Sequence, residues 1–80
     1  MIAVNTRKVR ALSSVKSGQT VRLVRISASP PLAGRLAAMG MLPHVEVMVV
    51  RNGRTGPCVI SVRESKIAIG RGVADKIEVE

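Results

Sequence analysis

Apolar and polar residues alternate with a period of two along much of the chain, which is typical of strands that bury one face. The clearest example is the segment in which every second residue is Val, at Val45, Val47 and Val49. Similar runs, bounded by turn-forming residues, predict further short strands. We expect these strands over residues 19–27, 58–63, 66–69 and 76–80.

The strand expected over residues 19–27 changes its phase halfway along. Val21 and Leu23 share one face, whereas Val24 and Ile26 share the other. Such a switch predicts a β-bulge or a strong twist, because an extra residue in one strand moves the following side chains to the opposite face. Small barrels need such bends in order to curl.

One segment shows helical spacing instead. Leu32, Leu36 and Met39 follow each other at i, i+4 and i+7, which places all three on one face of a helix. We therefore expect a short helix whose apolar face, Met39 included, packs against the core.

Both ends of this helix carry boundary signals. Ser29 is placed to cap the first turn through its hydroxyl, and Pro30 suits the first helical position. Gly40 can adopt the left-handed conformation that ends a helix. Inside the helix, Gly34 weakens it by up to about 1 kcal/mol relative to Ala.

The remaining segments read as connections. Residues 12–18 predict a short helical turn, and residues 70–75 predict a loop or a single helical turn. Asn52-Gly53 is a strong turn signal, but the residues up to Pro57 make this connection longer than a two-residue hairpin. The expected fold is therefore mainly β: a small barrel of about five strands with one short inserted α-helix.

Composition narrows the class further. A chain of 80 residues forms one domain, and because it has no Phe, Trp or Tyr its core must be aliphatic. We divide it into a basic N-terminal extension, residues 1–11, and a barrel domain, residues 12–80. Cys58 is the single cysteine, so no internal disulfide can form.

No apolar run approaches the roughly 20 residues that a membrane span requires. The basic N-terminus is not followed by the apolar stretch of a secretory signal. We therefore expect a cytoplasmic protein without direct membrane insertion.

Catalytic and metal-binding chemistry is sparse. His44 is the single histidine, and no motif in the sequence pairs it with a carboxylate that would orient it as a base. One His and one Cys cannot supply the three or four ligands of a usual protein metal site, although a site shared between subunits through His44 stays open. We expect no enzyme activity, no catalytic residues, no metal site and no cofactor.

The net charge of +8 suggests an anionic partner. Single-strand nucleic-acid binders stack bases on aromatic side chains, and this chain has none, so nucleic acid is an unlikely partner. A basic barrel that binds nucleic acid through phosphates alone remains the alternative interpretation.

One segment favours a docking role. Met41, Leu42 and Pro43 follow the helix directly and lie close in sequence to Arg35. These apolar side chains either plug the end of the barrel or form an exposed ledge bordered by Arg35, which would be a binding site for another protein.

The run from Leu32 to Pro43 resembles the helix-and-turn signature of the FeoA family, small proteins of bacterial ferrous iron uptake. That family typically reads Leu-x-x-Arg-Leu-x-x-Met/Leu-Gly-Leu/Met-x-Pro-Gly. Residues 12–18 are similar to its Leu-x-x-Leu-x-x-Gly, and Gly56-Pro57 and residues 67–71 resemble its second half. His44 and Glu64 stand where the family often has Gly.

The resemblance implies an SH3-like barrel that acts as a cytosolic adaptor for FeoB, a membrane transporter with a GTP-binding domain. Docking would modulate nucleotide turnover or transport. Because a five-stranded barrel often leaves one edge unpaired, homo-oligomers are also compatible with the sequence. The candidate partner-binding residues are Arg35, Met39, Met41, Leu42, Pro43 and His44.

Overall fold

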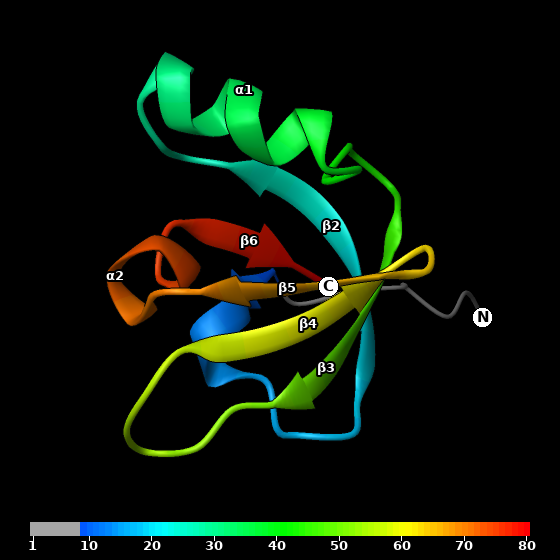
Figure 1. The fold of residues 1–80 in the computed structure, drawn as a ribbon, viewed down its shortest axis with the longest axis vertical. Coiled ribbons are helices and arrows are strands. Elements are labelled where there is room, and N and C mark those ends of the chain that lie inside the picture. The colour runs from blue at the N-terminus through cyan, green and yellow to red at the C-terminus, as the bar shows by residue number, and fades with distance from the viewer. Residues whose placement is uncertain (1–8) are drawn as a thin grey trace, which may run out of the picture.

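The structure is a computed structural model that describes residues 9–80. Its strands form one antiparallel sheet in the order β1-β6-β2-β3-β4-β5, which curls around an aliphatic core (Figure 1). The elements along the chain are β1 (Arg10–Ala11), the 3-10 helix η1 (Leu12–Ser14), β2 (Thr20–Ile26), α1 (Pro30–Ala38), β3 (Glu46–Arg51), β4 (Cys58–Val62), β5 (Ser65–Ile69), α2 (Arg71–Ala74) and β6 (Ile77–Val79).

The prediction of a mainly β fold with one inserted helix is confirmed, with two additions. The described residues contain six strands rather than about five, because the two-residue β1 pairs with β6. A strand of two residues is too short to show a period of two in the sequence. The segment expected to be a loop or helical turn contains the four-residue helix α2. β1 and β5 form the two ends of the sheet, so the sheet does not close.

The predicted boundary between the N-terminal extension and the barrel domain falls directly after β1. Arg10 and Ala11, which we assigned to the N-terminal extension, pair with Val79 and Glu78 of β6. Residues 1–8 of that extension lie outside the described residues.

The predicted bulge in β2 is present. The pairing of β2 with β6 shifts register between Leu23 and Arg25, and a second shift occurs between Val49 and Arg51 in the pairing of β3 with β4. Each irregularity bends its strand and increases the local twist, which lets a sheet of short strands curl around its own inner face.

The core consists of aliphatic side chains from the inner face of the sheet together with residues from η1, α1 and α2. Val47, Val49 and Ile60 are fully buried on the sheet. Within residues 9–80, the buried apolar residues are Leu12, Val15, Val21, Leu23, Leu36, Met41, Val47, Val49, Cys58, Ile60, Val62, Ile67, Ile69, Ala74, Ile77 and Val79.

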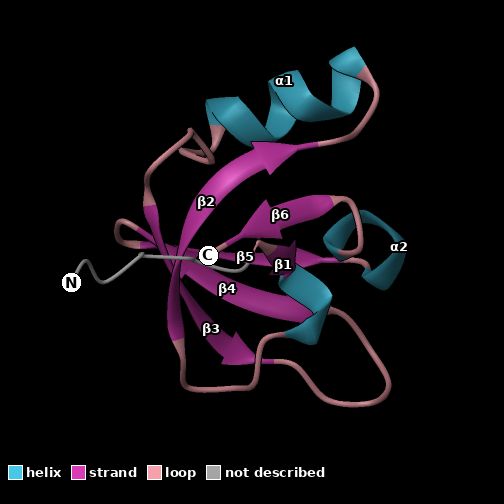
Figure 2. Ribbon diagram, turned by 180° about the vertical axis from the view of Figure 1, so that it is seen from behind, coloured by secondary structure: helices cyan, strands magenta, loops and turns pink. Residues whose placement is uncertain are grey.

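Asn52 ties the segment after η1 to the loop between β3 and β4. Its side-chain Nδ2 donates hydrogen bonds to the carbonyl oxygens of Ser13 (2.9 Å) and Val15 (2.6 Å), and its backbone N–H donates to Ser17 Oγ (2.8 Å). This loop and α1 lie at opposite ends of the long axis of the molecule (Figure 2). Within residues 9–80, no helix is long and apolar enough to cross a membrane.

Candidate functional site

The end of α1 is fixed by a Schellman motif. The backbone N–H of Met41 donates to Leu36 O (3.0 Å) and that of Gly40 donates to Ala37 O (3.0 Å), while Gly40 has a φ of 101°. This geometry satisfies carbonyl groups that a helix end leaves unpaired, and it brings an apolar residue after the glycine onto the last turn. Accordingly, Met41 (1% exposed) and Leu36 (4% exposed) are both buried in the core.

A β-turn over residues 42–45 follows immediately. Val45 N–H donates to Leu42 O (3.1 Å), Pro43 occupies the second position, and His44 occupies the third with a φ of 74°. Pro at the second position and a positive φ at the third define a type II turn. The hydrogen bond from His44 N–H to Leu23 O (2.7 Å) then anchors the turn on β2.

Exposed side chains of the last turn of α1 and of these two motifs lie within residues 35–44, and we name them the helix-exit surface. Met39 and Leu42 are each 44% exposed, so two of the four exposed large apolar side chains in residues 9–80 lie here. The helix-exit surface consists of Arg35, Met39, Leu42, Pro43 and His44, all of which are exposed.

The sequence left open whether residues 41 and 42 plug the barrel or form a ledge. The structure divides them: Met41 is buried and Leu42 is exposed. Of the six candidate residues, five are therefore exposed and Met41 is buried.

Two expectations about the helix are wrong. Met39 is not in the core, because the helix ends at Ala38 and the Schellman motif directs Met41 inward in its place. Ser29 is the N-cap residue, but its hydroxyl makes no capping hydrogen bond. The backbone carbonyl of Ser29 instead accepts from Ala33 N–H (2.8 Å), as in any first helical turn.

The helix-exit surface contains the positive charge of Arg35 and no carboxylate. Arg35 is the only charged residue of α1 and makes no ion pair with any residue that the structure describes. By contrast, Arg25 Nε lies 2.8 Å from Glu78 Oε1 elsewhere on the barrel. Arg35 therefore keeps its full set of donors available to a carboxylate on another molecule.

Arg63 borders this surface, and the sequence reading missed it. It is the first central residue of the two-residue turn between β4 and β5 and has a φ of 52°. A Cβ added to Gly40 would lie 3.9 Å from Arg63 Cδ, so the turn packs beside the helix exit. The FeoA family often has Gly at the position of Glu64 in this turn, but the residue with the positive φ is Arg63.

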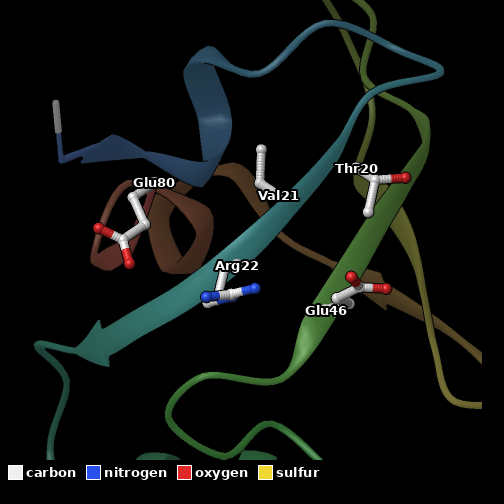
Figure 3. Close-up of a pocket in the computed structure, with 5 residues that line it drawn as sticks. All are labelled: Thr20, Val21, Arg22, Glu46 and Glu80. Carbon is white, nitrogen blue, oxygen red and sulfur yellow. The ribbon is translucent and has the colours of Figure 1, made fainter. Parts of the chain in front are cut away.

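A second feature is a pair of shallow grooves on the outer face of the sheet. Thr20 and Glu46 line both, and Figure 3 shows them with Arg22 on the neighbouring strands β2 and β3. The larger groove has a volume of about 420 Å³ and extends over Met48, Ser61 and Arg63.

Reactive groups do not converge in the described part of the chain. Cys58 is fully buried, and burial raises the pKa of its thiol, with the nearby Arg71 charge opposing this. No three His, Cys, Asp or Glu side chains among residues 9–80 cluster so that they could hold a metal ion.

Comparison with known proteins identifies the family. Residues 10–80 match the FeoA domain family. A relative from Methanocaldococcus jannaschii, named "Putative Fe(2+) transport protein A", is 42% identical over 69 residues, which cover 86% of this chain and 83% of the relative.

Two solved structures are similar in three dimensions. A crystal structure described as iron uptake regulatory protein (FeoA) superposes with a TM-score of 0.82 at 30% identity, covering 92% of this chain and 97% of the other. The zinc-complexed FeoA of Stenotrophomonas maltophilia, described as an SH3 domain protein, gives a TM-score of 0.77 at 21% identity and 88% coverage of both chains. The predicted SH3-like fold is thereby confirmed, and the chain belongs to the FeoA family.

Proposed function

We propose that this protein is a cytoplasmic, non-enzymatic accessory protein of ferrous iron uptake that docks on a FeoB-type transporter. Family membership and the name of the archaeal relative support the link to iron uptake. The helix-exit surface supports docking as the mode of action. The contact would modulate the GTP-binding domain of the transporter or its transport step.

The observation that carries this proposal is the combination of exposed apolar area with an unpaired cation. Met39 and Leu42 are each 44% exposed, and Arg35 beside them has no ionic partner within the described residues. Interface hot spots commonly combine an apolar anchor with Arg. The fitting partner is an apolar depression with a carboxylate at its rim.

Rigidity also favours a docking role for this surface. The Schellman motif, the type II turn and the bond from His44 N–H to Leu23 O hold the backbone before any partner arrives. Because little backbone ordering is left for the binding step, less conformational entropy is lost on association.

Titration of the purified cytosolic domain of FeoB into the chain tests this proposal. Leu42→Asp buries a charge against the partner, and Arg35→Glu reverses the cation, so we expect each to weaken binding by about tenfold or more. The matched control is Met48→Asp, because Met48 is 45% exposed but lies on the outer sheet face.

Circular dichroism verifies that all three variants keep the fold. Equal affinity of wild type, Leu42→Asp and Arg35→Glu for the transporter domain would show that the helix-exit surface is not the docking site. Parallel titrations with and without guanine nucleotide show whether docking responds to the state of that domain.

A further inference from the structure

The outer face of the sheet carries a row of charges that alternate in sign across neighbouring strands. Arg22 of β2 is the Cα partner of Glu46 of β3. The register of β3 with β4 pairs Met48 with Ser61, and Arg63 follows the last residue of β4 in the turn to β5. Glu46 and Arg63 line the same groove.

These charges have no ionic partner among residues 9–80. None of Arg22, Glu46 and Arg63 forms an ion pair with another residue in the described part of the chain, although opposite charges are neighbours along the row. All three side chains are exposed. They are therefore available to opposite charges on another molecule.

An apolar side chain lies next to this row. Met48 is 45% exposed and is flanked on the outer face by its register partners Thr20 and Ser61. These neighbours are small and uncharged, so a second surface can approach Met48 closely. We use the name outer-face patch for Arg22, Glu46, Met48, Ser61 and Arg63.

We propose that the outer-face patch binds the same patch of a second copy of this chain. A twofold axis that runs parallel to the strands between β3 and β4 places Glu46 opposite Arg63 of the second copy. The same rotation places Arg63 opposite Glu46 of the second copy, because a twofold interface repeats each contact. The same rotation places each Met48 side chain opposite Ser61 of the other copy, close to the axis.

Charge complementarity identifies the second copy as the occupant. An acidic residue and a basic residue on neighbouring strands exchange places under this rotation, so the patch is complementary to itself. Such complementarity fixes the register of an association more than it adds affinity. Because the sheet is curved and each chain carries a net charge of +8, the contact area is small and long-range repulsion opposes association. The dimer is consequently weak and reversible.

Sedimentation equilibrium of the full chain, from about 10 μM to about 1 mM, measures this association. We expect dimers at the upper end for wild type. Glu46→Arg alone and Arg63→Glu alone each create two like-charge contacts, so each weakens self-association by about tenfold or more. The double variant Glu46→Arg/Arg63→Glu restores opposite charges at both contacts and recovers the dimer.

An equimolar mixture of the two single variants gives a further readout. Every contact between Glu46→Arg and Arg63→Glu chains is attractive, so they form a mixed dimer although neither variant dimerises alone. Misfolding cannot produce this pattern.

The matched control is Arg35→Glu, which changes the helix-exit surface and leaves self-association as in wild type. It also separates this proposal from docking on the transporter. A wild-type chain that stays monomeric at about 1 mM, or single charge swaps that dimerise as well as wild type, would overturn the proposal.

Discussion

Two residues at the helix-exit end of the barrel adopt a backbone conformation that suits glycine better. His44 has a φ of 74° and Arg63 has a φ of 52°, and they are the non-glycine residues with positive φ in residues 9–80. A left-handed backbone costs an L-residue roughly 1–2 kcal/mol. Both turns therefore store strain next to the candidate residues of the helix-exit surface.

Replacement of His44 by Gly should stabilise the fold. We expect the free energy of unfolding, measured with urea, to rise by about 0.5–1 kcal/mol, because relief of strain exceeds the added entropy of the unfolded chain. His44→Ala is the control, since Ala keeps the strain. Equal stability of His44→Gly and His44→Ala would show that the turn is not strained.

Cys58 provides a prediction about pH. Burial raises the pKa of its thiol above the ordinary value of 9.0 in spite of the Arg71 charge, so the folded state holds this proton more tightly than the unfolded state. Stability is therefore unaffected by this group well below its ordinary pKa of 9.0 and falls as the pH rises from there toward its folded pKa.

Urea unfolding at several alkaline pH values checks this, with Cys58→Ser as the comparison because it removes the titrating thiol. Iodoacetamide should label Cys58 only as fast as the protein opens. Labelling of the native chain at the rate of a free thiol would contradict the burial of Cys58.

Replacing the two glycines of the helix segment by Ala should change the free energy of unfolding in opposite directions. Gly34 has an ordinary φ and nothing within 4 Å of an added Cβ, so Gly34→Ala should raise the free energy of unfolding by up to about 1 kcal/mol. Gly40 has a φ of 101°, so Gly40→Ala should lower it by about 1–2 kcal/mol. Thermal unfolding of both variants measures the difference, and equal effects would refute the Schellman geometry.

The elements with repeated spacing could be predicted from the sequence. Val47 and Val49 revealed β3, and Pro30 and Gly40 marked the helix ends, because each signal depends on local backbone preferences. The exposure of Met39 could not be predicted in the same way. It depends on whether the helix continues for one more residue, which the Schellman motif decides. The two-residue β1 depends on pairing with β6, far away in the sequence.

At the scale of the whole molecule, the net charge of +8 predicts weak attraction to nucleic acid. With no aromatic side chains for base stacking, this attraction rests on phosphate contacts and falls steeply with salt. We expect a gel shift with single-stranded DNA to vanish between about 50 mM and 200 mM salt. A sequence-specific complex that survives the higher salt concentration would favour a nucleic-acid function.

The sequence was sufficient to predict which segment contains the candidate site, but not which of its side chains are exposed. The order of residues 35–44 indicated docking residues, yet only the folded chain separates buried Met41 from exposed Leu42. Arg63 borders the site from the turn between β4 and β5, and Glu46 lines the same groove as Arg63. Such neighbours come from tertiary packing, which no local pattern contains.

We propose that residues 35–44 form the contact with the transporter. Nuclear magnetic resonance titration of the isotope-labelled chain with the unlabelled cytosolic domain of FeoB locates this contact residue by residue. Backbone amide shifts should concentrate on this segment, while the loop over residues 52–57 at the opposite end should stay unchanged. Saturable binding that shifts the loop and leaves residues 35–44 unaffected would contradict it.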